Sequence, residues 1–212
     1  MPVGATLDDM TVIDVLAAAA LWSLQILALV WLLTAIWFAA RWPAGPRGKI
    51  WHFLSTLLPE PWMILGIIVL SVATHLVPQT FWSHVTWTWS AFTAVGAVLV
   101  VASVALMIWA RLALGDMWAG RPMLQQDHQL RTGGPYRLVR HPIYTGLLGV
   151  MVGLTLMSGF GATTLTLIFV LAWLLRRVRV EDRMLSIAFG DQYREFQNRV
   201  PALIPFLGRS NA

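Results

Sequence analysis

The segment RHPIYTGLLGVMVGLTLMSGFGATTLTLIFVLAWLLRR, residues 140–177, decides the fold. From residue 143 to residue 175 it contains no Asp, Glu, Lys or Arg, and MSGFG at 157–161 is typical of a tight turn. A bilayer core requires about 20 apolar residues per helix. We therefore predict a hairpin of two short membrane helices, accommodated by neighbouring helices or thinned lipid, and a single tilted span is the alternative.

Two further uncharged stretches precede this one. Residues 15–40 form one predicted span, and residues 61–110 are long enough for two, which we expect at about 61–77 and 85–110. Only 12% of the 212 residues are charged and 58% are hydrophobic, whereas soluble domains carry about 25% charged residues. The chain is therefore predicted to be an all-α, polytopic membrane helix bundle with about five transmembrane helices.

Arginine and lysine collect in three places, which are the 40–60 loop, the 111–141 loop and the tail from residue 176. Because basic loops stay in the cytoplasm, five spans place all three on that side and leave the N-terminus outside. The acidic start, MPVGATLDDM, lacks a basic n-region, which argues against a cleaved signal peptide. We expect two regions. Residues 1–110 form an N-terminal membrane region with three spans, and residues 111–212 hold a cytosolic loop, the hairpin and a cytosolic tail.

Composition and motifs exclude several classes of function. The chain has no cysteine, so disulfides, thiolate nucleophiles and cysteine metal sites are absent. Its five histidines show no HxxxH or HExxH spacing, so we expect no metal site. It has no GxSxG, no P-loop and no GxGxxG after a strand. The net charge of +5 lies beside the apolar runs, where it sets topology and meets anionic lipid, so nucleic-acid binding is not expected.

Most of the polar side chains that remain lie in residues 114–146 and in residues 176–206. If the hairpin forms, these two segments emerge side by side and line a pocket at the membrane surface. Arg140 and His141 precede Pro142, which suits the first turn of a helix whose free N–H groups favour an anion. The same histidine can also be a simple helix cap.

The second segment begins with Arg177 and Glu181, which are four residues apart and share a face of a helix. An arginine in such a pair can hold a substrate carboxylate with two parallel hydrogen bonds, and the glutamate can hold ribose hydroxyls or a cationic group. Taken alone, the pair is also a common feature of helix surfaces.

The two segments together form the array GPY-x3-RHP-x-Y-x-G, about 30 apolar residues, then R-x3-E-D-x2-L-x3-FG-x2-Y-x2-F-x3-VP-x2-IPF. This array resembles the isoprenylcysteine carboxyl methyltransferase family, and the related phospholipid N-methyltransferases share much of it. The similarity covers roughly residues 112–207. No single motif of the array is specific, but the order and spacing of the motifs together are. Asp182 stands where the family pattern often has a second glutamate.

The resemblance implies an integral membrane methyltransferase that uses S-adenosylmethionine (SAM). In that family the cofactor lies in a cytosolic pocket made by the last membrane helices and the C-terminal segment, and a lipophilic acceptor enters from the bilayer. We expect this protein to differ from the eukaryotic isoprenylcysteine enzymes, which have extra N-terminal helices, so their prenyl-protein substrate is not expected to carry over. The resemblance assigns catalytic roles to Arg177, on the substrate side, and to Glu181. Cofactor contacts map onto His128, Gln129, Leu130, Arg131, Tyr136, Arg140, His141, Pro142, Ile143, Tyr144 and Glu181.

The acceptor stays open between two chemical classes. A carboxylate is already ionised at pH 7 and needs only alignment and exclusion of water, with Arg177 as its holder. An amine acceptor must lose a proton, for which Glu181, Asp182 or His141 is a candidate base.

Two other functions remain as alternatives, which are an NADPH-dependent membrane reductase of the sterol-reductase type and a non-enzymatic membrane protein. The expected partners are membrane lipids and a lipophilic small molecule, and the oligomeric state is not predicted. The expected location is a prokaryotic plasma membrane, or else an organelle membrane, with the active site facing the cytoplasm.

Overall fold

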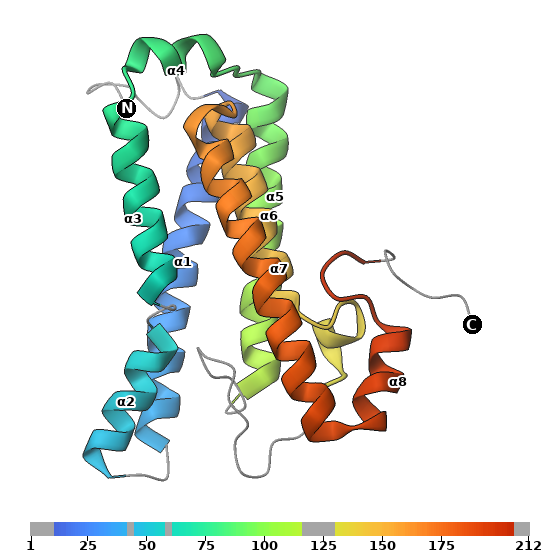
Figure 1. Cartoon of the computed structure of the whole chain (residues 1–212). Coiled ribbons are helices and arrows are strands. Elements are labelled where there is room, and N and C mark those ends of the chain that lie inside the picture. Colours follow the sequence, from blue (N-terminus) through green and yellow to red (C-terminus); the bar gives the residue numbers. More distant parts are fainter. Residues whose placement is uncertain (1–10, 42–44, 58–60, 116–129, 206–212) are drawn as a thin grey trace.

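The computed structural model describes residues 11–41, 45–57, 61–115 and 130–205 (Figure 1). Within these residues the regular structure is helical, and the β pairing is limited to one isolated bridge between Thr86 and Phe160. The predicted all-α class is confirmed. The elements are α1 (Val12–Arg41), α2 (Pro46–Leu57), α3 (Pro61–Leu76), α4 (Gln79–Val85), α5 (Ser90–Leu114), the short 3-10 helix η3 (Gly134–Arg137), α6 (Pro142–Ser158), α7 (Gly161–Phe189) and α8 (Asp191–Arg199).

Three of these helices, α1, α5 and α7, are long and apolar enough to cross a bilayer. The pair α3–α4, which is bent by 99°, would supply a fourth span, and α6 is a shorter apolar helix of 17 residues. Large apolar side chains such as Trp22, Ile26 and Leu29 are exposed along α1, which suits contact with lipid. The chain is thus an integral membrane protein, and the count of five spans and the orientation of the termini remain predictions.

The helices lie close to the predicted spans, with two corrections. The 40–60 loop contains α2, and the break expected at residues 77–84 contains α4. Proline accounts for both starts, because Pro46 is the first residue of α2 and Pro78 is the N-cap of α4. The fixed φ of proline suits the beginning of a helix, although it also interrupts a longer one.

The closest helix packing is between α5 and α6, which run side by side (Figure 1). A Cβ atom added to Gly153 would lie 2.7 Å from the carbonyl oxygen of Gly96, and one added to Gly149 would lie 2.1 Å from Ser103 Oγ. Glycine is therefore required at position 153, where the clash is with backbone, as in other membrane helix pairs that pack through small residues. The pair anchors the main apolar core, which includes Val100, Val104, Met107 and Val150.

The turn between α6 and α7 forms the predicted hairpin. Gly159 ends α6 in the left-handed region at φ 81°, and the N–H groups of Gly159 and Phe160 both donate to the carbonyl oxygen of Thr155. The N–H of Trp87 donates to Gly159, which fastens the turn to the chain before α5. Residues 143–175 therefore make two antiparallel helices and not one continuous helix.

At the other end of the hairpin, α7 continues as a helix through the charged sequence VRVEDR to Phe189, and α8 folds back beside it (Figure 1). The residues after α8, which we call the C-terminal segment (200–205), then return to the start of α6. The N–H groups of Arg140 and His141 donate to the carbonyl oxygens of Pro201 and Ala202. The tail and the start of α6 are therefore one structural unit.

Candidate active site

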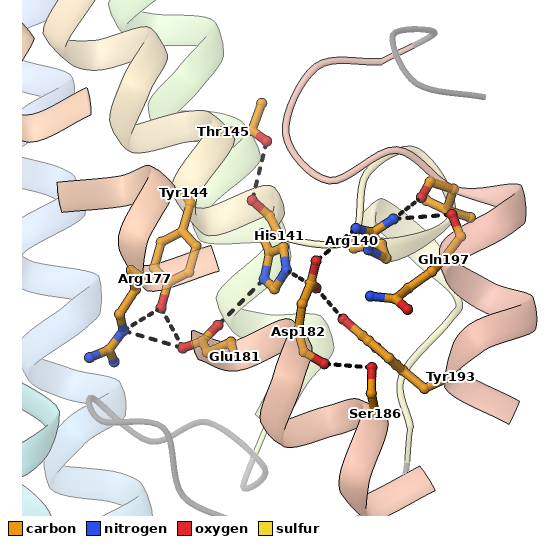
Figure 2. Close-up of polar contacts among 11 residues, drawn as sticks. Arg140, His141, Tyr144, Thr145, Arg177, Glu181, Asp182, Ser186, Tyr193 and Gln197 are labelled. Carbon is orange, nitrogen blue, oxygen red and sulfur yellow. Dashed lines mark hydrogen bonds and ion pairs between the residues drawn. The ribbon is translucent and has the colours of Figure 1, made fainter. Parts of the chain in front are cut away.

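A cluster of polar side chains lies where α6 begins and α7 approaches its end (Figure 2). Two cations in it are nearly inaccessible to solvent, because Arg177 is 5% exposed and His141 is 6% exposed. Charged groups are rarely buried to this extent unless they are paired. The cluster consists of Arg140, His141, Tyr144, Arg177, Glu181 and Asp182.

On the α7 side, three groups meet around one carboxylate oxygen. The hydroxyl of Tyr144 donates to Glu181 Oε1, and Arg177 Nε donates to the same hydroxyl at 2.9 Å. Arg177 Nε also lies 3.4 Å from Glu181 Oε1. Because Arg177 and Glu181 are one turn apart on α7, the helix itself sets their spacing. The tyrosine from α6 thereby links the two helices.

On the α6 side, His141 lies between two carboxylates. Its Nε2 is 2.8 Å from Asp182 Oδ1, and its Nδ1 is 3.4 Å from Glu181 Oε2 (Figure 2). Pro142 begins α6, so His141 is the N-cap and its ring stays outside the helix. The ring stacks on that of Tyr144, with centroids 5.6 Å apart and an interplanar angle of 20°.

The contacts of His141 raise its pKa. Burial by itself lowers the pKa of this histidine, but the hydrogen bonds to Asp182 and Glu181 and the charges of these carboxylates raise it above the ordinary value of 6.5. Both ring nitrogens face carboxylate oxygens, and only the imidazolium carries a proton on each of them. The site therefore favours the imidazolium form of His141, in which it joins the cations Arg140 and Arg177 opposite the two carboxylates.

Asp182 was predicted only as a candidate base for an amine acceptor and Tyr193 was not predicted, yet Asp182 lies within the cluster and Tyr193 contacts it. Asp182 accepts from Arg140 Nη2 at 2.8 Å, from His141, and from the hydroxyl of Tyr193 on α8. The sequence array already contained a signal for this, because the Asp and the later Tyr are both positions of it. The array does not, however, say that they touch.

The structure brings together five of the predicted site residues, which are Arg140, His141, Tyr144, Arg177 and Glu181. The other described site residues that were predicted lie around this cluster and not in it. Pro142 is fully buried at the start of α6, and Ile143 packs against the α5–α6 core. Tyr136 and Leu130 belong to an apolar cluster with Tyr193 and Phe196, and the Tyr136 hydroxyl is 3.5 Å from the carbonyl oxygen of Ala110. Arg131 is exposed, and His128 and Gln129 lie outside the described residues.

Comparison with known proteins adds the family. The model of the phospholipid methyltransferase family matches residues 91–192, which include α6, α7 and the polar cluster. The cobalt-zinc-cadmium resistance protein CzcN of Cupriavidus metallidurans is 32% identical over 167 residues, which is 78% of this chain and 71% of CzcN.

Two named enzymes match a shorter region. The protein-S-isoprenylcysteine O-methyltransferase of Schizosaccharomyces pombe is 35% identical over 83 residues, which is 39% of this chain and 35% of that enzyme. Methanethiol S-methyltransferase 1 of Bradyrhizobium diazoefficiens is 37% identical over 75 residues, which is 34% of this chain and 24% of that enzyme. The match thus spans less than half the length of either enzyme.

The helix hairpin and its polar cluster define an integral membrane protein with a charged site at one end of its bundle. In particular, the chain belongs to the family of membrane methyltransferases that includes the phospholipid and isoprenylcysteine enzymes. The resemblance seen in the sequence is confirmed.

Proposed function

We propose that this protein transfers a methyl group from SAM to a small lipophilic acceptor that reacts as an anion. The observation that carries the proposal is that the two carboxylate oxygens of Glu181 make different contacts. Its Oε1 is occupied by Tyr144 and Arg177, whereas its Oε2 is 3.4 Å from His141 Nδ1, which is longer than an ordinary N–H···O bond of about 2.7–3.2 Å. This oxygen therefore retains acceptor capacity for a donor on a ligand.

The residues fit the chemical groups of SAM. Glu181 offers an acceptor for a ribose hydroxyl or an ammonium group, and the excess of cations in the cluster offers partners for a carboxylate. The ε nitrogen of Arg140 is buried and makes no hydrogen bond within the part of the chain that the structure describes, so these residues leave a donor unused as well. When bound, SAM supplies an electrophilic methyl group on a sulfonium. The protein holds and orients the two reactants and excludes water from the site.

The hydrogen bonds of the cluster favour an anionic acceptor over an amine. An amine must lose a proton, but each candidate base is engaged: both ring nitrogens of His141 face carboxylates, Asp182 accepts from three donors, and Glu181 Oε1 is paired with Tyr144 and Arg177. A carboxylate is already ionised at pH 7 and needs no base, whereas a thiol first releases its proton to solvent and then reacts as the thiolate. In each case the lone pair of the anion forms the bond to the methyl carbon as the C–S bond of the sulfonium breaks. Among the described residues the cluster thus holds and orients an acceptor better than it removes a proton.

Arg177 is proposed to hold the anion. Its guanidinium is buried between Tyr144 and Glu181, and it lies 6.0 Å from the ring of Trp173, one turn earlier on α7. Trp173 in turn packs with Met63, Leu148 and Met151 in an apolar cluster. A cation next to an apolar cluster suits an acceptor with a charged head and a hydrocarbon body.

Calorimetry of the purified protein in mild detergent tests the cofactor. The parent, Glu181→Gln, His141→Gln and the exposed control Arg194→Gln are titrated with S-adenosylhomocysteine, SAM and NADPH. We expect the parent and the control to bind both adenosyl ligands and the two site variants to lose at least about tenfold in affinity, as the removal of a charged hydrogen-bond partner predicts. Binding of NADPH alone, or of none of the three by folded protein, would refute the proposal.

Transfer of a labelled methyl group tests the acceptor. The three acceptors are a prenylthio carboxylic acid, an alkanethiol and phosphatidylethanolamine, each presented in mixed micelles. We expect transfer to the acid or the thiol and little to the amine. Efficient methylation of phosphatidylethanolamine alone would show that the anionic class is wrong while leaving SAM use in place.

A further inference from the structure

Asp182 follows Glu181 directly in the sequence but makes different contacts. Its Oδ2 receives a hydrogen bond from Arg140 Nη2 at 2.8 Å, and its Oδ1 is shared by His141 Nε2 and the Tyr193 hydroxyl (Figure 2). These three donors come from the chain before α6 and from α8. With 18% of its side chain exposed and three donors bound, Asp182 has little acceptor capacity left for a ligand.

The same cation that pairs with Asp182 also holds the C-terminal segment. Arg140 Nη1 donates to the carbonyl oxygens of Gln197 and Val200, at 3.1 and 2.6 Å. The hydroxyl of Thr145, one turn into α6, donates to Leu203. Together with the backbone bonds from residues 140 and 141 to residues 201 and 202, these contacts tie the tail to the start of α6.

We propose that Asp182 is a positioning residue, which keeps the His141 ring turned with Nδ1 toward Glu181 and, through Arg140 and Tyr193, fastens α8 and the C-terminal segment to the site. The proposal rests on the proposed function, in which Glu181 binds the ligand. Asp182 touches no ligand itself, but it sets the contact between His141 and Glu181. The proposal assigns the two adjacent carboxylates separate tasks, with Glu181 facing the ligand and Asp182 facing the protein.

The charges around His141 support this division. Glu181 and Asp182 from α7 face its two ring nitrogens, Tyr144 from α6 stacks on its ring, and Arg140 precedes it in the chain. The contact to Asp182, at 2.8 Å, is a full hydrogen bond, whereas the contact to Glu181, at 3.4 Å, is long. The orientation of the ring is therefore set mainly by Asp182. Loss of that charge removes the stronger of two partners that keep the ring protonated.

The test follows the titration of His141 by NMR in protein with isotope-labelled histidine, with His141→Gln used to assign the signal. Four variants are compared with the parent: Asp182→Asn, Asp182→Glu, Tyr193→Phe and Asp191→Asn. Asp191 is the matched control, because its side chain is 90% exposed and pairs with Arg194 on its own helix. The measurement needs neither cofactor nor acceptor, so it is independent of methyl transfer.

The variants are expected to move the titration midpoint in opposite directions. In Asp182→Asn the midpoint falls, because the neutral amide no longer stabilises the imidazolium. In Tyr193→Phe it rises, since Asp182 Oδ1 loses a competing donor and becomes a better acceptor for His141. Asp182→Glu restores a carboxylate and stays near the parent value, and Asp191→Asn does not change it.

The second readout is the affinity for S-adenosylhomocysteine as a function of pH. In the parent the affinity is expected to be constant across the neutral range, and in Asp182→Asn it falls by at least about tenfold above the lowered midpoint. Equal falls of the midpoint in Asp182→Asn and Tyr193→Phe would mean general loosening and would overturn the proposal, as would an unchanged midpoint in folded Asp182→Asn. If Asp182→Asn does not fold, the rise in Tyr193→Phe and the parent-like Asp182→Glu decide the question. If the parent binds no adenosyl ligand but the midpoints move as expected, the proposed function fails and the positioning of His141 stands.

Discussion

Replacing Gly153 by alanine tests the helix packing that supports the site. The added Cβ would lie 2.7 Å from the Gly96 carbonyl oxygen, 2.7 Å from Val100 Cγ2 and 3.2 Å from the Val100 backbone nitrogen. Ordinary contacts of this kind begin at 3.4 Å, so α5 and α6 must separate locally by about 0.7 Å. Two of the three atoms belong to the backbone of α5, which cannot rotate out of the way. Overpacking of this kind costs about 1–3 kcal/mol.

The expected result is a lower melting temperature in detergent, by roughly 2–4 °C for each kcal/mol in a chain of this length. Gly149→Ala provides the comparison, because its Cβ would meet Ser103 Oγ at 2.1 Å, and a serine side chain can turn away. We expect a smaller loss there and recovery in the double variant Gly149→Ala/Ser103→Gly. Gly133→Ala is the neutral control, since nothing lies within 4 Å of its added Cβ and its φ is −91°.

Thermal unfolding followed by circular dichroism measures all four variants, and binding of S-adenosylhomocysteine is measured beside it. Because α6 carries His141 at its start, a shift of the helix should weaken the site as well as the fold. A Gly153→Ala protein that melts with the parent would refute the reasoning, as would equal losses at Gly153 and Gly133. Failure of Ser103→Gly to rescue Gly149→Ala would show that the clash at that position involves more than the serine.

Three further predictions concern the polar cluster. The pKa of His141 is raised in the folded protein, so its contribution to stability is fully present below the ordinary value of 6.5 and is lost as pH rises through the folded pKa; His141→Gln should remove this pH dependence from the melting curve. Tyr144→Phe removes the hydroxyl between Arg177 and Glu181 and should weaken binding of S-adenosylhomocysteine by about 1–3 kcal/mol in calorimetry, with little change of fold. The double variant Arg177→Met/Glu181→Leu should melt at or above the parent temperature but bind no adenosyl ligand, whereas Glu181→Leu alone should melt lower because it removes a carboxylate that pairs with the buried Arg177.

The apolar part of the fold was predictable because its signal is local. A run without charges marks a membrane helix wherever it occurs, and MSGFG marked the turn that Gly159 and Phe160 form. The helices α2 and α4 were not predicted, because a polar loop and a break at a proline are both typical of irregular structure. The end of α7 was also not predictable from hydropathy, since the helix continues past Leu175 through residues that favour helix but not lipid.

The site was predictable in part, for a different reason. Arg177 and Glu181 follow from helical spacing, and His141 with Tyr144 from the start of the next helix. Asp182 was weighed only as a base for an amine acceptor, because nothing local indicates that it reaches Arg140, His141 and a tyrosine on α8. The contacts to Arg140 and His141 join residues more than forty positions apart, and the contact to Tyr193 depends on how α7 and α8 pack, which a pattern along the chain does not contain.

The polar cluster is not explained by stability alone. Burying Arg177 and His141 carries a desolvation cost that their partners offset only in part, and apolar residues of similar size hold helices together at least as well. The same protein demonstrates this one helix away, where α5 and α6 pack through glycines and aliphatic side chains without any ion pair between them among the described contacts. Binding of a polar ligand therefore accounts for a charged cluster at the end of such a bundle better than stability does. The hydrogen bonds divide the cluster into two parts. Asp182 bonds to residues that hold the tail, whereas Glu181 retains capacity to accept a hydrogen bond. A ligand would therefore form its new hydrogen bonds at Glu181.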